Sequence, residues 1–362
     1  MSALVFACLD ADTLGGVQRV THTVAQGLAG RGHEVHVIGL HRARRPFRYV
    51  ERPRYRRHVI HRTTAGPVGR VARRLADRRL RALFQRIGPG HVVMTSPAVV
   101  SRLLSLLPPD LSGIGHYHGS FEHARGTWHL GSVRRDWWRL EQAVFLSEDD
   151  AGLFAEHAML PNTWALANPL PGWPGRTAEL SARRVLGVGR LAGVKRFDRL
   201  ISAFAAACER VPEPWELHLI GEGEELPRLR EHAKAAGVAG RVVFRGRVSP
   251  RRMAVEYLNG SVLGLASEHE GAPLAVAEAA AFGVPAVAFD VSGGMRSLVA
   301  SGRTGMLVPP GDVAAFAAAL ADLMGSAGER RRLGAAARAH AESFRLDQVL
   351  DGWEALLAHL AR

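Results

Sequence analysis

The segment that decides the fold is residues 261–290, which read SVLGLASEHEGAPLAVAEAAAFGVPAVAFD. The short apolar runs at residues 261–266 and 284–289 are typical of strands buried on both faces of a sheet. Between them, the apolar residues of 274–282 predict a helix. A strand, a crossover helix and a second strand form a βαβ unit, in which the two strands lie parallel in one sheet.

The same alternation of short apolar runs and helical stretches continues along the whole chain. In the first half, strands are expected at residues 3–8, 34–40, 91–95, 113–117 and 143–147. In the second half, they are expected at residues 184–189, 216–220, 241–245, 261–266, 284–289 and 306–308. Helices are expected at 197–209 and 224–236, and Asp312 is a suitable N-cap for another. The alternation predicts the α/β class with doubly wound parallel sheets.

The halves meet at residues 168–175, a stretch rich in proline and glycine that indicates a linker. A length of 362 residues suits two domains, which we expect at residues 1–168 and 176–343. Both are expected to be Rossmann-like. Residues 344–362 place Leu346, Val349, Leu350, Trp353, Leu356, Leu357 and Leu360 at helical spacing. This periodicity fits a helix on either domain, and packing back on the N-terminal domain is one expectation.

The composition is that of a globular protein, with 47% hydrophobic and 22% charged residues. Cys8 and Cys208 are the only cysteines, which favours a reducing compartment over a disulfide framework. The apolar run at residues 3–9 is too short for a secretory leader, and no run approaches the roughly 20 apolar residues that span a bilayer. A cytoplasmic location is therefore expected, with peripheral contact at the inner membrane face as an option.

The formal net charge is +13, and Lys195 and Lys234 are the only lysines among 47 basic residues. A coding bias towards arginine accounts for most of this usage, but the arginines also cluster. Nine lie from Arg42 to Arg62, and seven more lie from Arg70 to Arg86. Such a patch fits an anionic membrane, an anionic polymer or nucleic acid. We expect Arg42 to Arg62 to contact an anionic membrane or acceptor, and we expect no nucleic acid.

Two motifs in the first half follow expected strands, where open α/β sheets bind ligands. Gly15 and Gly16 follow the first strand and open a helix, so the backbone can approach an anion closely. The motif lacks the dinucleotide fingerprint, which disfavours a dehydrogenase. Asp10 and Asp12 have a spacing that can hold a divalent metal, although capping or turn formation is the favoured interpretation. Near the 113–117 strand end, His118 is a candidate for contact with a substrate hydroxyl.

In the second half, Arg190 and Lys195 follow the strand at residues 184–189. Two cations on one strand-to-helix turn suit a diphosphate leaving group, because arginine clamps phosphate with two donors and lysine adds a point charge. A solvated basic turn is the alternative, although a lysine in so arginine-rich a chain argues against it. The turns at residues 221–223 and 245–248, the second of which holds Arg245 and Val248, also end strands and fit the border of a nucleotide.

The strongest motif is the pair Glu270 and Glu278 in the opening segment. Glu270 lies in the loop after a buried strand, whereas Glu278 lies in an apolar helix. A carboxylate there is costly unless it is hydrogen-bonded, and a ribose diol supplies two hydroxyl donors. Between the glutamates, a helix N-terminus offers backbone N–H groups to a diphosphate. The residues of this turn are Gly271, Ala272, Pro273 and Leu274.

Taken together, these motifs resemble the family 4 retaining glycosyltransferases, whose GT-B fold has two Rossmann-like domains facing across a cleft. The resemblance covers most of the chain and is most specific at the Glu-Gly-x-Pro-Leu opening of the glutamate pair. It implies that Arg190 and Lys195 hold the donor diphosphate, Glu278 binds the ribose and Glu270 contacts the transferred sugar. Gly15, Gly16 and the turns at 245–248 and 271–274 would border the donor, and His118 would lie near the sugar or acceptor.

The resemblance further implies a nucleotide-diphosphate sugar, most often a uridine diphosphate sugar, as the donor substrate. It implies no cofactor and no catalytic metal, because the arginine and the lysine neutralise the leaving group. A carbohydrate, polymer or lipid would be the acceptor, and a cell-envelope polymer or glycolipid is the favoured choice over a small natural product. A nucleotide-sugar epimerase or hydrolase of the same fold, and a nucleic-acid-binding protein, are the competing hypotheses.

Two positions depart from the family pattern. Family members often carry a glutamate shortly after a Gly-Gly pair, whereas Gly293 and Gly294 are followed here by Met295, Arg296 and Ser297, so the contact that such a glutamate makes is in doubt. Ala272 stands where a phenylalanine is common, which predicts a wider sugar pocket.

Overall fold

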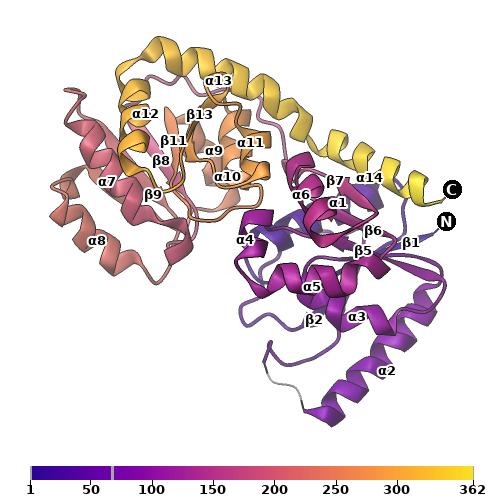
Figure 1. Cartoon of the computed structure of the whole chain (residues 1–362). Coiled ribbons are helices and arrows are strands. Elements are labelled where there is room, and N and C mark those ends of the chain that lie inside the picture. Colours follow the sequence, from indigo (N-terminus) through magenta and orange to yellow (C-terminus); the bar gives the residue numbers. More distant parts are fainter. Residues whose placement is uncertain (1, 67–68, 362) are drawn as a thin grey trace. The chain divides into compact units, whose positions relative to one another are not determined.

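The apolar runs form strands in two separate parallel sheets, one in each of two α/β units (Figure 1). The computed structural model describes residues 2–66 and 69–361. The first unit comprises Met1–Pro171 together with Leu346–Arg362, and the second comprises Gly172–Arg345. The chain therefore passes between the units twice.

The described residues of the first unit form a seven-stranded parallel sheet with the order β3-β2-β1-β4-β5-β6-β7. Its strands are β1 (Ala3–Asp10), β2 (Val35–His41), β3 (Arg56–Val59), β4 (Gly90–Met94), β5 (Leu111–His116), β6 (Gln142–Phe145) and β7 (Thr163–Ala165). Its helices are α1 (Gly16–Gly30), α2 (Arg70–Ile87), α3 (Pro97–Leu103), α4 (Phe121–Arg125), α5 (Trp128–Asp136), α6 (Glu148–Ala158) and α14 (Leu346–Leu360).

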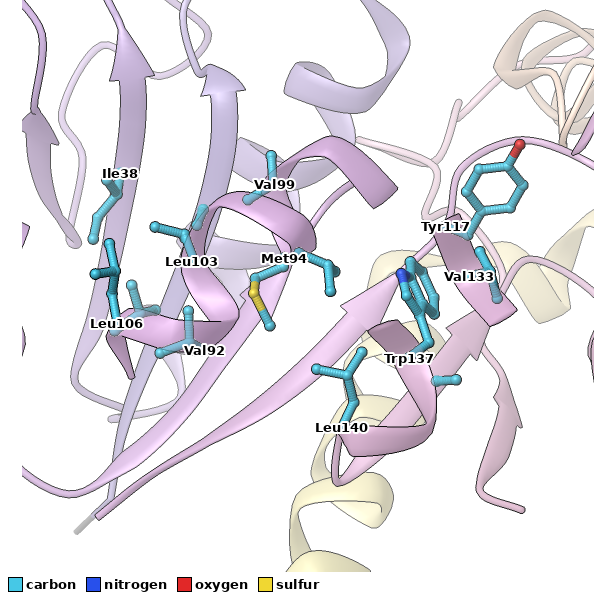
Figure 2. Close-up of a cluster of buried hydrophobic side chains, with 14 of the residues drawn as sticks. Ile38, Val92, Met94, Val99, Leu103, Leu106, Tyr117, Val133, Trp137 and Leu140 are labelled. Atoms are coloured by element: carbon cyan, nitrogen blue, oxygen red, sulfur yellow. The ribbon is translucent and has the colours of Figure 1, made fainter. Parts of the chain in front are cut away.

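Both faces of this sheet are covered, which is why its central strands are continuously apolar. On one face, Val5 of β1 joins a buried cluster with residues of α2, α3, α5 and α6 (Figure 2). On the other face, Phe6 packs edge-on against Trp353 of α14, with ring centroids 5.6 Å apart. Cys8 Sγ lies 3.7 Å from Thr21 Oγ1 of α1 on that face. Successive side chains of β1 therefore point to opposite faces of the sheet and pack against a different helical layer on each face.

The described residues of the second unit form a six-stranded parallel sheet with the order β10-β9-β8-β11-β12-β13. Its strands are β8 (Arg184–Val188), β9 (Glu216–Ile220), β10 (Val242–Gly246), β11 (Val262–Leu265), β12 (Ala286–Phe289) and β13 (Gly305–Val308). Its helices are α7 (Phe197–Cys208), α8 (Leu226–Ala235), α9 (Pro250–Leu258), α10 (Leu274–Ala281), α11 (Gly293–Leu298), α12 (Val313–Gly325) and α13 (Ala327–Ala341). The prediction of an N-cap at Asp312 is confirmed, because its side chain accepts a hydrogen bond from Ala315 N at 2.9 Å.

The C-terminal helix α14 packs on α1 in the first unit. It starts at Leu346 rather than at residue 344, because Glu342–Phe344 forms a 3-10 turn. Leu350 occupies the space beside Gly27, so a side chain at Gly27 would collide with it. At the rim, Arg31 Nη1 lies 2.6 Å from Asp351 Oδ1 and 2.7 Å from Glu354 Oε2. An apolar stripe and an ionic rim therefore hold the end of the chain on the unit in which it begins.

The strands β3 and β7 were not predicted from the sequence, and β3 lies in an arginine cluster, as does the unpredicted helix α2. β3 has an exposed or half-exposed side chain at each position, as edge strands often do, so no apolar run marks it. β7 has only three residues. α2 buries one stripe, formed by Ala76, Leu80, Leu83 and Phe84, beneath a surface of arginines. That stripe has helical spacing and was available as a sequence signal.

We expect Trp353→Ala to lower the free energy of unfolding by about 3–5 kcal/mol, because the side chain is 1% exposed and its loss leaves a cavity. Urea denaturation followed by circular dichroism measures this change. Trp138→Ala is the matched control, since Trp138 is 60% exposed, and its effect should stay below about 1 kcal/mol. Equal effects of the two substitutions would contradict the packing described for α14.

Candidate functional site

The order of strands in the second sheet reverses between β8 and β11. Two neighbouring strands whose connections leave in opposite directions open a crevice at their carboxyl ends, where α/β proteins bind ligands. The loop after β8 carries Arg190 and Lys195, and the loop after β11 carries Glu270 and Gly271. The sheet thus brings two motifs together that are far apart in the sequence.

Lys195 and Glu270 form an ion pair across this reversal, with Nζ 2.6 Å from Oε1. The side chains are 23% and 10% exposed, so the pair is largely shielded from water. The backbone joins the same two loops, because Glu268 N donates to Val194 O at 2.9 Å. An ammonium group has three N–H donors, and Glu270 takes only one. Lys195 is therefore held in place while it keeps donors for a second anion.

Arg190 lies at the start of the same loop and is exposed. Among the side chains that the structure describes, none forms a hydrogen bond or an ion pair with its guanidinium group. Its backbone position is fixed by the next residue, since Leu191 N donates to Glu222 O at 3.1 Å and Leu191 O accepts from Glu225 N at 3.1 Å. An exposed cationic head without a side-chain partner, on an anchored loop, suits a ligand that brings its own negative charge.

The turns after β9 and β10 are packed against this loop by their glycines. Gly221 N donates to Gly246 O at 2.9 Å, and a side chain at Gly221 would collide with the carbonyl of Gly189. Gly221 also has φ +148°, which favours glycine. In the β10 turn, Glu256 Oε1 accepts from Arg245 Nη2 at 2.7 Å, while Val248 is half-buried. Arg245 is thus held within the unit, beside the expected donor site.

Glu278 lies half-buried on α10, and its Oε2 accepts a hydrogen bond from the hydroxyl of Tyr257 at 2.8 Å. Tyr257 comes from α9 and is 1% exposed. Its ring stacks on Phe282 with centroids 5.3 Å apart, so the phenol that holds the carboxylate is itself fixed by packing. No pattern in the sequence pointed to Tyr257, because the contact joins residues from separate helices.

The turn at residues 271–274 leads into α10. The N-cap residue of this helix is Pro273, and no side chain forms a capping hydrogen bond there. The first amides of the helix therefore lack the usual internal acceptor and can serve an anion. Ser292 fixes the turn, since its Oγ donates to Gly271 O at 2.9 Å. Gly294 packs so closely on the same carbonyl that any side chain there would collide with it. Met295, in the run after Gly294 that lacks the family's glutamate, is fully buried.

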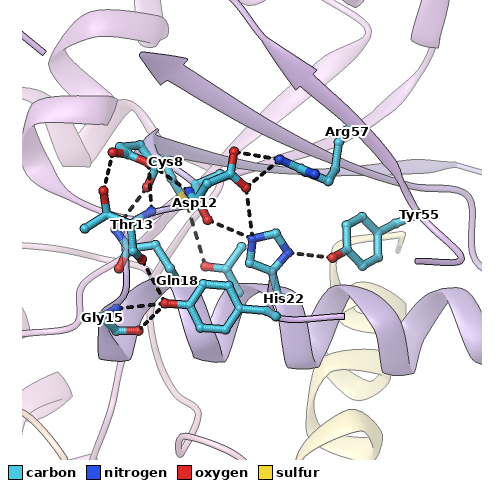
Figure 3. Close-up of polar contacts among 12 residues, drawn as sticks. Cys8, Asp12, Thr13, Gly15, Gln18, His22, Tyr55 and Arg57 are labelled. Atoms are coloured by element: carbon cyan, nitrogen blue, oxygen red, sulfur yellow. Dashed lines mark hydrogen bonds and ion pairs between the residues drawn. The ribbon is translucent and has the colours of Figure 1, made fainter. Parts of the chain in front are cut away.

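In the first unit, Gly15 ends the turn between β1 and α1 (Figure 3), and Gly16 is the first residue of α1. The turn interpretation of Asp10 is confirmed, because its carboxylate accepts from Asp12 N at 2.8 Å and Thr13 N at 3.0 Å. Asp12 is also engaged, with Arg57 Nη2 2.6 Å from each of its carboxylate oxygens. Among the described residues, no group of three or more His, Cys, Asp or Glu side chains is arranged to hold a metal ion.

His116 ends β5, and His118 follows it at the carboxyl edge of the first sheet. Their ring centroids are 4.1 Å apart, and His116 packs edge-on against Trp353 at 5.4 Å. Burial lowers the pKa of His118 to about 4, and burial with the neighbouring His118 lowers the pKa of His116 well below its ordinary value. Both Nε2 atoms are buried without a hydrogen-bond partner among the described residues. The pair is therefore neutral at neutral pH.

Sequence profiles of two families match the chain. The family described as Glycosyl transferases group 1 matches residues 177–340, and Glycosyltransferase Family 4 matches residues 14–151. The chain belongs to the family 4 glycosyltransferases. Both matches contain candidate site residues, since Glu270 and Glu278 fall in the first and Gly15 and His118 fall in the second.

This glycosyltransferase has curated relatives over most of its length. It is 28% identical to an exopolysaccharide phosphotransferase, SCO2592, of Streptomyces coelicolor over 96% of its own residues, which span only 40% of that protein. It is 26% identical to an uncharacterized glycosyltransferase of Haemophilus influenzae, with 99% of this chain and 100% of that one covered.

Solved structures support the GT-B fold. Sucrose-phosphate synthase from Thermosynechococcus elongatus has a TM-score of 0.84 at 18% identity, with 99% of each chain covered. HepE of Anabaena, solved with UDP and glucose, has a TM-score of 0.79 at 16% identity, with 99% of this chain and 100% of that one covered. Within the described residues, each helix is too short or too polar to cross a membrane.

The buried His118 predicts a loss of stability in acid. In the folded protein its pKa is about 4, against 6.5 for an ordinary histidine. Between these values the unfolded chain binds a proton that the native protein does not, so the stability present above pH 6.5 is lost as the pH falls towards 4. The contribution amounts to about 3 kcal/mol.

Urea denaturation at a series of pH values tests this effect. His118→Gln should show a shallower loss of unfolding free energy than the wild type between pH 6.5 and pH 4. His359→Gln is the control, because His359 is exposed and should leave the slope unchanged. Parallel curves for His118→Gln and the wild type would contradict the burial of this imidazole.

Proposed function

We propose that this family 4 glycosyltransferase transfers a sugar from a uridine diphosphate sugar to an acceptor hydroxyl with retention of configuration at the sugar carbon. The observation that carries the proposal is the Lys195–Glu270 pair at the strand-order reversal. It stands beside an exposed Arg190 and a helix N-terminus without a side-chain cap. These groups suit a diphosphate and the hydroxyls of a sugar. The UDP named in the HepE structure supports this choice of nucleotide.

In the proposed reaction, Arg190 and Lys195 bind the donor diphosphate and neutralise the charge that grows as it leaves. Electrostatic stabilisation is most effective where charge develops in the transition state. Glu278, oriented by Tyr257, accepts hydrogen bonds from the ribose hydroxyls, and Glu270 accepts from the transferred sugar. The sugar–phosphate bond breaks, the acceptor oxygen bonds to the same carbon, and its proton passes to a phosphate oxygen. The scheme places no metal ion at the diphosphate.

We expect Arg190→Ala, Lys195→Ala and Glu278→Ala each to lower kcat/KM by about 100-fold or more, because the first two remove contacts to the donor diphosphate and the third removes the contact to its ribose. Lys234→Ala is the matched control for lysine. Lys234 is exposed on α8 and, among the described side chains, pairs only with Glu231, so its loss should leave turnover unchanged. Thermal unfolding checks that the variants remain folded, and normal transfer by all three would reject the assigned site.

Calorimetry with a panel of nucleotide-diphosphate sugars tests donor binding itself. A thermal-shift screen across nucleoside diphosphates identifies the base, since a ligand that binds only the native state raises the unfolding temperature. Donor conversion without added acceptor would favour an epimerase or hydrolase of the same fold. If no donor associates at millimolar concentration, the proposed function is wrong.

For the acceptor, we propose a cell-envelope polymer or glycolipid that is met at an anionic membrane surface. Names of relatives such as the lipopolysaccharide 1,6-galactosyltransferase of Salmonella typhimurium support this class. The structure also shows which arginines of the basic segment from Arg42 to Arg62 are engaged in ion pairs within the protein. Arg56 pairs with Glu34 and Arg57 with Asp12, whereas the other seven arginines there are exposed and have no acidic partner among the described side chains. Those seven carry the proposed membrane contact.

Replacement of Arg42, Arg44 and Arg45 by glutamine should weaken binding to vesicles that contain phosphatidylglycerol. Each arginine near such a surface contributes about 1 kcal/mol, so the loss should approach about 100-fold. A triple variant at the exposed Arg210, Arg303 and Arg331 makes the same change in net charge in the second unit. Vesicle co-sedimentation should separate the two variants, and equal binding would exclude this surface.

A further inference from the structure

A strap formed by residues 47–57, which follows β2 and includes the first two residues of β3, lies against the glycine turn at the start of α1 (Figure 3). The strap belongs to the arginine-rich segment, yet its aromatic residues make the contacts with the turn. The hydroxyl of Tyr49 accepts a hydrogen bond from Gly15 N at 2.8 Å and donates to Thr13 O at 2.8 Å. A single phenol thus satisfies a donor and an acceptor of the same short turn.

Further contacts fix the strap on both sides of Tyr49. Arg57 holds the carboxylate of Asp12, and Phe47 N donates to Asp12 O at 2.7 Å. The Tyr49 ring stacks on His22 of α1, with centroids 5.0 Å apart. These contacts leave Tyr49 little freedom to move away from the turn.

The hydrogen-bond partners of His22 determine which of its ring nitrogens carries the proton. Its Nε2 lies 2.7 Å from the carbonyl of Ala11, which only accepts, so Nε2 carries the proton. Nδ1 therefore accepts from the hydroxyl of Tyr55 at 2.6 Å. Burial lowers the pKa of His22, which keeps the ring neutral in this arrangement. Tyr55 thus ties the strap to the helix, whereas Tyr49 ties it to the turn.

Asp10 orders the first part of the turn through Asp12 N and Thr13 N, but the glycine end has little rigidity of its own. Gly15 is the N-cap of α1 and provides no side-chain cap, and a side chain at Gly16 would meet open space. Glycine has the greatest backbone freedom of any residue, so contacts from outside the turn are needed to order this end. Tyr49 supplies the contact to the Gly15 amide.

We propose that Tyr49 is a positioning residue that holds the Gly15–Gly16 turn in the conformation that receives the donor. This inference rests on the proposed function, which assigns that turn to the donor. Loss of the hydroxyl reduces the fraction of molecules with an ordered turn, and the apparent affinity for the donor falls by the same factor. Saturating donor restores the ordered state, so kcat changes little.

Tyr49→Phe tests the proposal, because it keeps the ring on His22 and removes only the hydroxyl. Hydrogen exchange of the Gly15 amide, followed by NMR on the full chain, should accelerate roughly fivefold, the factor that corresponds to one net hydrogen bond. The KM for a uridine diphosphate sugar should rise at nearly constant kcat, by the factor by which the ordered fraction falls. Tyr55→Phe is the matched control, since it makes the same change on the same strap without touching the turn. It should alter thermal stability but neither the Gly15 exchange nor the KM.

An unchanged Gly15 exchange rate in Tyr49→Phe overturns the proposal. Faster exchange with an unchanged donor KM overturns its link to the donor. The exchange measurement needs no substrate, so a wild-type protein that binds no donor sugar would count against the proposed function while the contact between Tyr49 and the turn is still decided.

Discussion

A parallel sheet sends every strand of the second unit towards the same edge, and the reversal of strand order between β8 and β11 decides what meets there. At this point, connections leave in opposite directions and cannot cover the strand ends. Lys195 from one loop and Glu270 from the other meet at these uncovered strand ends and form an ion pair of 2.6 Å. The glycine contacts at 189, 221 and 294 then pack the neighbouring loops around this pair. The site is therefore a consequence of topology before it is one of side-chain chemistry.

The burial of Glu270 gives this ion pair a particular role. A carboxylate that is 10% exposed has lost most of its water and needs a partner, and Lys195 is the partner that the fold supplies. The reverse dependence is weaker, because Lys195 is 23% exposed and has further N–H donors. An arriving diphosphate therefore meets a cation that is already oriented. Pre-orientation of this kind removes reorganisation at the moment when charge develops.

The sequence was most informative where strands are buried on both faces. β9 was predicted at its observed bounds, and β1, β8 and β12 were predicted within two residues of theirs. The exposed β3 and the arginine-covered α2 were missed, because charge hides the apolar signal at an edge. The motif residues could be placed at strand ends by topology alone. Their supports could not be predicted, since the contacts of Tyr257 with Glu278 and of Tyr49 with Gly15 join separate elements and depend on packing.

Because the chain is rich in arginine, the presence of a lysine at position 195 calls for a physical reason. Arginines in this chain often serve as the planar partner of a carboxylate or a ring, as Arg57 on Asp12, Arg245 on Glu256 and Arg338 over Trp173 show. A guanidinium facing Glu270 would favour a bidentate contact that commits both sides of its fork to the carboxylate. An ammonium group makes one contact with Oε1 and leaves its other donors directed elsewhere. Where a cation must hold a fixed anion and still receive a second one, lysine is the better choice, even in a chain that otherwise uses arginine.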